Sequence, residues 1–408
     1  MFKVLKVDVI EKYKVLYALM NTGFVSGIIT IYYLTKGLTY AQIGIATAIS
    51  TIGFFLFEVP TGVVGDKISR KKSVLIGLTL FPIGTLILIF LKNFPMLIAY
   101  SIITSLSVTF ISGSLEAWLY DNLKHLGKEK EYRELMKEIK TITLPLSAIT
   151  IIIGSLLAQH YGFKLPLILT LILEITMLMT ALSIPEYEFK KPEVAYHVHV
   201  LHSIKEITKP NLFWLIIMAI TVTMSINQFR QYFEPYLGNI LAQSLKTTIM
   251  GTLGLLGLIE AIVKVIPRLI GVRLKEKWSA FAYSIAPVSI PILTALSVIY
   301  QNPIFIVILG VIATIINTAF AFNFGIELQV RIPSEKRATL ISLYSMISAL
   351  IMAFFYGIYG FAVDKLGLAE ARLVFALILS GISLAFKGAQ TIGIPKEPLK
   401  LKHLKSEN

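Results

Sequence analysis

Apolar residues in this chain gather into long runs that are separated by short polar segments. A helix needs about 20 mostly apolar residues to cross the hydrocarbon core of a bilayer, which is about 30 Å thick. Twelve runs of about that length occur. They predict helices over Val15–Leu34, Tyr40–Val64, Ser73–Leu91, Phe94–Tyr120, Thr141–Phe163, Leu165–Ile184, Leu212–Phe233, Thr247–Ile270, Trp278–Tyr300, Ile304–Leu328, Ala338–Val363 and Leu366–Phe386. The pattern therefore predicts an all-α membrane protein with twelve transmembrane helices.

One polar connection is much longer than the others, and it follows the sixth run. Residues 186–211 are rich in charged residues, with apolar runs on both sides. They divide the chain into a six-helix bundle at residues 1–185 and a second at 212–390, followed by a polar tail at 391–408. A basic loop follows the second run of each half, so we expect two related, pseudo-symmetric bundles joined by a cytoplasmic linker.

The composition excludes an ordinary soluble domain, because 55% of the residues are hydrophobic, 15% are charged and the mean hydropathy is +0.75. A net charge of +14 would suit a nucleic-acid-binding protein, but 30 of the 38 lysines and arginines fall on one side of the predicted membrane. Arg230 and Lys264 lie within spans, and six are assigned to the other side: Lys36, Lys92, Lys164, Lys246, Lys365 and Arg372. By the positive-inside rule we expect a multi-pass protein of the cell membrane with both termini in the cytoplasm and no nucleic-acid partner.

Several kinds of chemistry are absent from the sequence. Without cysteine the chain has no disulfide, no thiolate metal site and no cysteine nucleophile. It has no phosphate-binding loop of the Gly-x-x-x-x-Gly-Lys-Ser/Thr type for ATP. His197, His199 and His202 lie in the linker without the nearby cysteine or cage of acidic residues that is typical of a metal site. We therefore expect no enzyme activity, no cofactor and no bound metal.

The segment from Phe57 to Lys72 closes the second apolar run and opens the third. It resembles the Gly-x-x-x-Asp-Arg-x-Gly-Arg-Lys-Lys loop of the major facilitator superfamily (MFS), with Lys67 and Ser69 as departures. The matching residues are Gly62, Asp66, Arg70, Lys71 and Lys72. The resemblance implies a secondary transporter with two rocking halves, in which this loop is a cytoplasmic latch. In that role Asp66 pairs with Arg70, faces the start of the eleventh span and touches no substrate.

Two further segments resemble a drug-exporter-like subgroup of the same superfamily. They are Ser112–Asp121, at the end of the fourth run, and Pro333–Ser342, at the start of the eleventh. The fifth run lacks the Gly-x-x-x-Gly-Pro-x-x-Gly-Gly segment typical of many proton-coupled drug antiporters, which weakens that prediction. The resemblance also implies that spans one, four, seven and ten line a central cavity.

Ionisable and amide side chains inside the predicted spans are the candidates for binding substrate or protons, because a charge within the membrane is costly unless it is paired or functional. The candidates are Glu58, Glu116, Glu174, Glu260, Arg230, Lys264, Asn21, Asn227, Gln231 and Asn317.

Five of the six ionisable candidates also have a purely structural interpretation. Glu58 suits a helix-packing acid, and Glu174 is either a proton site or a neutral, hydrogen-bonded acid. Glu260 and Lys264 are four residues apart and can neutralise each other. Arg230 has the same spacing to Glu234 and lies near a helix end, where its side chain can reach the membrane interface.

These observations favour a secondary active transporter that exports amphipathic or cationic compounds in exchange for protons. The alternative is uptake of a small polar nutrient such as a sugar or organic anion, with Arg230 and Lys264 binding it. A more remote alternative is a membrane receptor or sensor that transports nothing. We expect the partners to be a small-molecule substrate, a proton or another coupling cation and the lipid bilayer, and the protein to act as a monomer.

Overall fold

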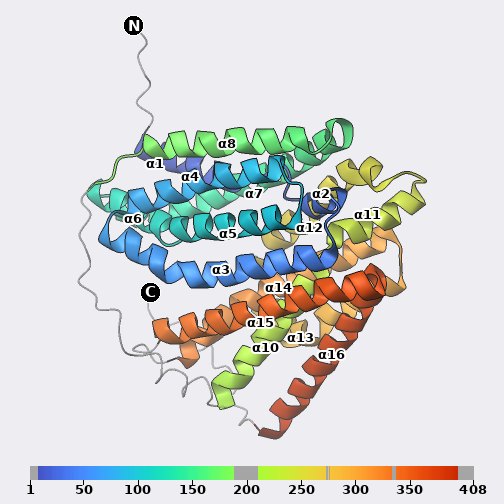
Figure 1. Ribbon diagram of the computed structural model, residues 1–408. Coiled ribbons are helices and arrows are strands. Elements are labelled where there is room, and N and C mark those ends of the chain that lie inside the picture. Colours follow the sequence, from blue (N-terminus) through green and yellow to red (C-terminus); the bar gives the residue numbers. More distant parts are fainter. Residues whose placement is uncertain (1–7, 188–209, 273, 275, 333–336, 394–408) are drawn as a thin grey trace.

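The computed structural model describes residues 8–187, 210–272, 274, 276–332 and 337–393, and these residues are almost entirely helical (Figure 1). The first half contains α1 (Val9–Met20), α2 (Ile29–Thr35), α3 (Tyr40–Lys67), α4 (Arg70–Ile89), α5 (Phe94–Ile111), α6 (Ser114–His125), η1 (Glu129–Glu131), α7 (Tyr132–Tyr161) and α8 (Lys164–Leu182). The second contains α10 (Pro210–Arg230), α11 (Phe233–Ser244), η2 (Ile249–Thr252), α12 (Leu253–Val272), α13 (Glu276–Ile299), α14 (Pro303–Arg331), α15 (Arg337–Leu366) and α16 (Leu368–Gly393). Most of the predicted linker, with its three histidines, lies outside the described residues.

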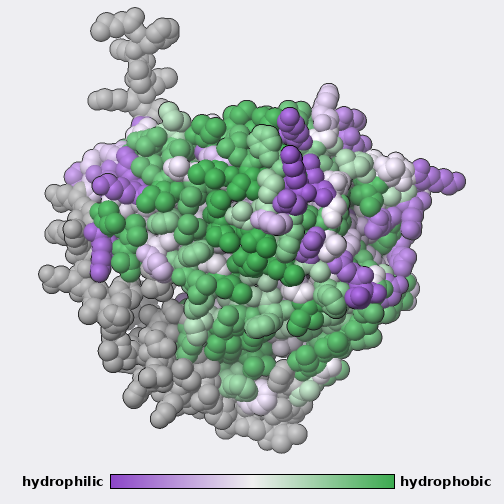
Figure 2. Space-filling view, in the orientation of Figure 1, coloured by the Kyte–Doolittle hydropathy of each residue, from purple (hydrophilic) through white to green (hydrophobic). Residues whose placement is uncertain are grey.

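Most of the long helices run roughly side by side, which gives the bundle two ends (Figure 1). We call the end where α8 finishes and α10 begins the linker end, and the end where α3 begins the Tyr40 end. Hydrophobic side chains cover the middle of the face seen in Figure 2, and hydrophilic ones gather toward the ends. Eleven stretches of the described chain are long and apolar enough to cross a membrane. The predicted all-α, multi-pass fold is confirmed.

Capping residues explain where several of these helices start. The side chain of Thr39 accepts a hydrogen bond from Gln42 N, and Gln42 returns one to the backbone of Thr39, which is a capping box for α3. Ser69 caps α4 and Asn93 caps α5 through the same kind of side-chain acceptor. The sequence therefore defines the turn between α2 and α3 and the loop between α3 and α4 locally.

The first predicted span, Val15–Leu34, is not one helix, which corrects the prediction. It is divided into α1 and α2 by residues 21–28. Asn21 donates a side-chain hydrogen bond to Tyr17 O at 2.8 Å, and Thr22 donates one to Leu19 O at 2.6 Å, so both bind the carbonyls that end α1. Gly23 and Gly27 favour an unwound segment, because glycine weakens a helix interior.

The first helix of the second half is broken in the corresponding place. The predicted span Leu212–Phe233 ends as α10 at Arg230, and α11 follows after two residues. Tyr232 holds the break with a φ of 59°, the left-handed region that is unfavourable for a residue with a Cβ. Its hydroxyl donates to Tyr40 O at 2.8 Å, and its ring packs on those of Tyr40 and Tyr359. These contacts offset a strain of about 1–3 kcal/mol.

Arg372 holds the second break and corrects a second prediction. We assigned this arginine to a segment outside the membrane, but it lies in α16 and is fully buried. Its Nη2 donates to Phe229 O at 2.5 Å, a carbonyl that the break leaves without its helical partner. The guanidinium lies over the rings of Phe229 and Tyr236, 4.9 and 4.8 Å from their centroids, in cation–π contact. Arg372 therefore satisfies the freed backbone of α10.

The two halves share an apolar core at the Tyr40 end. Buried side chains from both halves form one cluster there, including Tyr32 and Leu97 from the first and Tyr232 and Tyr359 from the second. The other two apolar clusters each take residues from one half only. Between the halves, α3 packs most extensively on α15 and α7 on α12. Gln159 Oε1 accepts a hydrogen bond from Gly254 N at 2.7 Å in the second of these contacts.

We predict that Gly154→Ala destabilises the protein. A Cβ at this position of α7 would lie 1.7 Å from Phe24 O in the unwound segment, so the backbone must move. Overpacking of this kind costs about 1–3 kcal/mol, and we expect a lower melting temperature in detergent. Gly325→Ala is the control, because its Cβ would meet no heavy atom within 4 Å. An equal melting temperature for the two variants would contradict the close approach of α7.

We predict that Arg372→Lys also lowers the melting temperature, because the ammonium cannot both bond Phe229 O and cover two rings. Loss of a charged hydrogen bond and of the ring contacts costs about 1–3 kcal/mol. Lys365→Met is the matched control, since Lys365 lies on the surface beside Phe361 and its loss should change stability by less than about 0.5 kcal/mol. Unchanged stability of Arg372→Lys would mean that the break is held by other contacts.

Candidate functional site

A group of charged side chains lies where α12 passes the break between α1 and α2. Lys264 Nζ lies 3.5 Å from Glu260 Oε1, which confirms the predicted pair. The same ammonium donates a hydrogen bond to Ser26 O in the unwound segment at 3.3 Å. Gly27 lies beside Glu260, since a Cβ there would be in ordinary contact with Glu260 Cβ at 3.6 Å, but the same Cβ would lie only 2.7 Å from Ile151 Cγ2 of α7. Lys264 thus connects α12 of the second half to the backbone of the first.

Glu234 joins this group from the first turn of α11. Its side chain is bonded to that of Thr30 in α2, and the charges of Glu260 and Lys264 act on it. The residue is only 7% exposed. Its carboxylate also lies close to the N-terminus of α11, where the helix dipole favours a negative charge. Both acids of the group are therefore removed from solvent and have partners.

Arg230 completes the group at the last residue of α10. The charges that act on its guanidinium are those of Glu260 and Arg268, and the residue is exposed. The predicted pair with Glu234 is not formed among the described residues. The reason is the break, because the left-handed Tyr232 between the two residues removes the helical geometry that brings positions four apart onto one face.

We call Arg230, Glu234, Glu260 and Lys264 the central cluster. Its formal charges cancel, since two acids face two cations. The acids are buried, whereas Arg230 is exposed and the Lys264 side chain keeps 33% of its surface accessible. A ligand that reaches the cluster therefore meets positive charge first. Such an arrangement can bind an anionic or hydrogen-bond-accepting group, and it can hold or release a proton at either carboxyl.

The amide candidates contribute less directly. Asn21 and Asn227 each donate to a carbonyl of their own helix, Tyr17 O and Thr223 O, at 2.8 Å. Gln231 lies half-buried in the α10–α11 break, next to Arg230. Asn317 is half-buried on α14. Of these four, Gln231 and Asn227 are near the cluster in sequence, one and three residues from Arg230.

The remaining acidic candidates lie apart from the cluster. Glu174 is buried, where α8 packs against α4, and accepts a hydrogen bond from Thr85 Oγ1 at 2.8 Å. Glu58 is exposed on α3, although the sequence suited an acid packed between helices. Glu116 is exposed at the start of α6. These acids were distinguished in the sequence by their position within an apolar run. That position does not indicate which face of its helix an acid occupies.

The basic loop at the linker end is anchored within the first half. Arg70 pairs with Asp121 of α6 and donates to Ala117 O at 3.1 Å. Its predicted pairing with Asp66 stays a prediction. Asp66 lies in the last turn of α3, next to the Gly65 that packs on α6, and Arg70 is the first residue of α4. Lys71 donates to the carbonyls of Leu182 and Ile184 that end α8, at 3.1 and 2.6 Å.

The two glycines of this loop differ in their contacts. A Cβ on Gly65 would lie 2.4 Å from Ser114 Oγ, as expected for a close helix contact, but one on Gly62 would meet nothing within 4 Å. Lys72 is exposed, and its amide donates to the Ser69 side chain that caps α4. The latch role of these residues stays a prediction.

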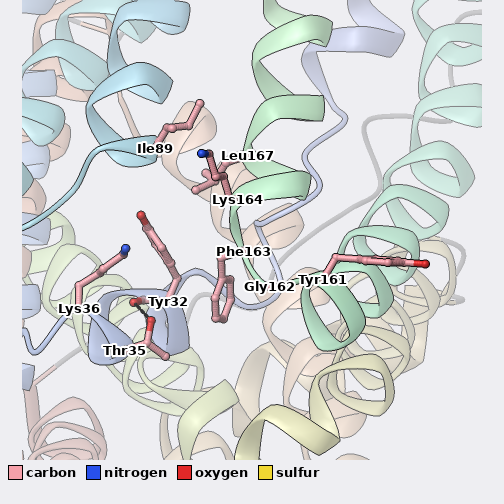
Figure 3. A pocket seen from close by; sticks show the side chains of 9 residues that line it. All are labelled: Tyr32, Thr35, Lys36, Ile89, Tyr161, Gly162, Phe163, Lys164 and Leu167. Atoms are coloured by element: carbon pink, nitrogen blue, oxygen red, sulfur yellow. Dashed lines mark hydrogen bonds between the residues drawn. The ribbon is translucent and has the colours of Figure 1, made fainter.

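A separate pocket of about 260 Å³ lies at the Tyr40 end (Figure 3). Its lining belongs entirely to the first half, including Tyr32, Lys36 and Lys164. The Tyr32 hydroxyl already donates to Leu88 O, and the Thr35 hydroxyl to Tyr32 O. We do not assign it to the substrate, because alternating access needs a site between the two halves. Among the described residues, no three His, Cys, Asp or Glu side chains are grouped to hold a metal ion.

Sequence reasoning missed Thr30 and the backbone carbonyl of Ser26 as participants in this site. Thr30 acts through its side chain on the short helix α2, and Ser26 acts through its backbone carbonyl in the unwound segment. Neither residue belongs to a recognisable motif. The available signal was Gly23 and Gly27 in the first span, together with the interrupted seventh span. Paired interruptions at corresponding places of two halves indicate a binding site in transporters.

Comparison with known proteins agrees with this fold. The sequence profile of the Major Facilitator Superfamily matches residues 15–356. YxaM, an MFS-type transporter of Bacillus subtilis (strain 168), is 24% identical over 230 residues, which are 53% of this chain and 55% of that protein. The chain thus matches about half the length of this curated relative. The drug-exporter-like subgroup is not shown by these matches and stays a prediction.

Two solved structures have the same fold at low sequence identity. A mutant of the nucleoside transporter NupG superposes with a TM-score of 0.75 at 16% identity, over 94% of this chain and 99% of that one. A bacterial homologue of the iron transporter ferroportin, in an inward-facing state, superposes with a TM-score of 0.68 at 14% identity and the same coverage. Because the family profile covers most of the sequence and the helices adopt the family's fold, the chain belongs to the Major Facilitator Superfamily of membrane transporters.

Proposed function

We propose that this protein is a proton-coupled transporter of a small polar solute that carries an anionic or strongly hydrogen-bond-accepting group. The observation that supports this proposal is the central cluster, in which the accessible charges are the cations Arg230 and Lys264. The cluster lies between the two halves and beside two broken helices. Substrates of secondary transporters bind at such places, where unwound backbone and half-helices meet near the membrane centre.

Charge balance supports a proton as the coupling ion. The four charges of the cluster cancel, so an anion that binds Arg230 or Lys264 adds a net negative charge in a region of low dielectric constant. Protonation of Glu260 removes that excess and frees Lys264 from its ion pair. Substrate and proton therefore bind together more favourably than either binds alone, and with an inward proton gradient this coupling drives uptake.

The export of lipophilic cations is less well supported. A cationic substrate needs an accessible carboxylate, but Glu234 is bonded to Thr30 and Glu260 is paired with Lys264. Phe355 and Tyr359 of α15 are buried in the core at the Tyr40 end, so their rings offer no accessible surface to a lipophilic cation. The polar-nutrient alternative from the sequence is therefore the better proposal.

The same proposal includes an orientation. The excess of lysine and arginine at the linker end supports a cytoplasmic linker and cytoplasmic termini in the cell membrane. The Tyr40 end, where the halves share a core, then faces outward, so this conformation is closed to the outside. One chain supplies both the central cluster and the first-half groups that contact it, Ser26 O and Thr30, which supports a monomer as the working unit.

We predict that Lys264→Met raises the KM for transport about tenfold or more, because a charged hydrogen bond to the substrate is lost. The measurement is uptake into liposomes that contain the purified protein and an internal pH-sensitive dye. The panel comprises lactate, citrate, uridine, glucose and tetraphenylphosphonium. Lys164→Met at the surface pocket is the matched control and should transport normally. Transport of tetraphenylphosphonium alone, unaffected by Lys264→Met, would support export and contradict the proposal.

We predict that Glu260→Gln separates substrate movement from proton movement, because the amide cannot take up a proton. Radiolabelled substrate should still equilibrate across the membrane, while the dye should report no accompanying change in pH. Glu174→Gln tests the other buried acid, and we expect it to keep the coupling because Glu174 lies beside α4, away from the cluster. Coupling lost in Glu174→Gln and kept in Glu260→Gln would make Glu174 the proton site instead.

A further inference from the structure

The carboxylate of Asp364 joins the two halves at the Tyr40 end. Asp364 lies in the last turn of α15, and its two oxygens accept hydrogen bonds from Tyr40 N at 2.9 Å and Ala41 N at 2.8 Å. These amides begin α3, where the backbone N–H groups have no acceptor within their own helix. One side chain of the second half thus caps a helix of the first, with the helix dipole adding to the attraction.

The surroundings show that α3 and α15 meet closely at this place. A Cβ on Gly44 would lie 2.4 Å from Tyr356 O, and one on Gly360 would lie 2.3 Å from Tyr40 O. Larger residues at either position would separate the helices. The Tyr232 hydroxyl also donates to Tyr40 O at 2.8 Å. The carboxylate therefore binds at a place where the two halves approach closely.

The two helices run in opposite directions, so each end of the pair places the start of one helix beside the finish of the other (Figure 1). At the linker end the last turn of α3 carries Asp66, and α15 begins there with Arg337. At the Tyr40 end the roles are exchanged, since Asp364 ends α15 and α3 begins.

We propose that Asp364 is a latch that holds the Tyr40 end closed, placed opposite the predicted latch at Asp66. The bonds to Tyr40 N and Ala41 N must break whenever this end opens, because they join residues of different halves. Loss of the carboxylate then shifts the population toward the conformation that is open at the Tyr40 end. The inference does not depend on the substrate, the coupling ion or the orientation in the membrane.

The absence of cysteine permits a direct test, because introduced cysteines are the only ones that react with a label. Spin labels at Lys92→Cys and Gln301→Cys lie in exposed turns at the Tyr40 end, one in each half. Pulsed electron resonance on the purified protein gives the distribution of distances between them. We expect Asp364→Asn to raise the population of long distances about two- to fivefold, the ordinary range for a charge at a helix start.

A second pair of variants removes the amide instead of the acid. Tyr40 is the first residue of α3 and follows the extended Thr39, which is the position that proline favours. Tyr40→Pro therefore removes the N–H donor and keeps the helix. Tyr40→Ala removes the same ring contacts and keeps the donor. We expect a larger population of long distances in Tyr40→Pro than in Tyr40→Ala.

Glu370→Gln is the control for the acid, because Glu370 is exposed in the first turn of α16 at the same end. It should leave the distance distribution unchanged. Each variant is checked for a single monodisperse peak in size-exclusion chromatography. Distributions for Asp364→Asn and Tyr40→Pro that match those of the parent and of Tyr40→Ala would overturn the latch. So would an equal shift in Glu370→Gln, which would mean that any loss of acidic charge opens this end.

Discussion

A backbone carbonyl inside a membrane needs a hydrogen-bond donor, and this requirement governs the centre of the structure. Two helices at corresponding places of the two halves are broken, so their freed carbonyls have lost their helical partners. A cation from another helix supplies the donor in each case. Lys264 bonds Ser26 O, and Arg372 bonds Phe229 O. The breaks persist because these cations offset the lost helical bonds.

The two cations differ in how easily they can change partner. Arg372 is fully buried between two aromatic rings, so its bond to α10 is a permanent part of the second half. The Lys264 side chain keeps a third of its surface accessible and shares its charge between a carbonyl of the first half and Glu260. A cation bonded to a backbone carbonyl therefore has a structural role at the break after α10. At the break between α1 and α2 the corresponding bond can be exchanged, which suits it to binding a ligand.

At the contact between α3 and α15, glycine residues allow the backbones of the two halves to approach closely. Gly44 and Gly360 let the backbones of α3 and α15 meet, and Asp364 uses the unpaired amides that begin α3. No sequence motif predicts this contact, because its acceptor is one isolated acid and its donors are backbone N–H groups that are present at the start of every helix. The loop at the other end was found in the sequence because side chains, clustered within a few residues, carry its charges.

The sequence by itself determined the helical content, the number and approximate bounds of the apolar runs and the family resemblance. These depend on local properties, namely hydropathy over about 20 residues and a contiguous motif. Only the tertiary structure decided where the helices break, that Arg372 is buried and that Arg230 and Glu234 separate. It also decided that Glu260 reaches the unwound segment while Glu174 stays beside α4. The reason is that a charge in an apolar run must find a partner, and which partner it finds depends on helices far away in the sequence.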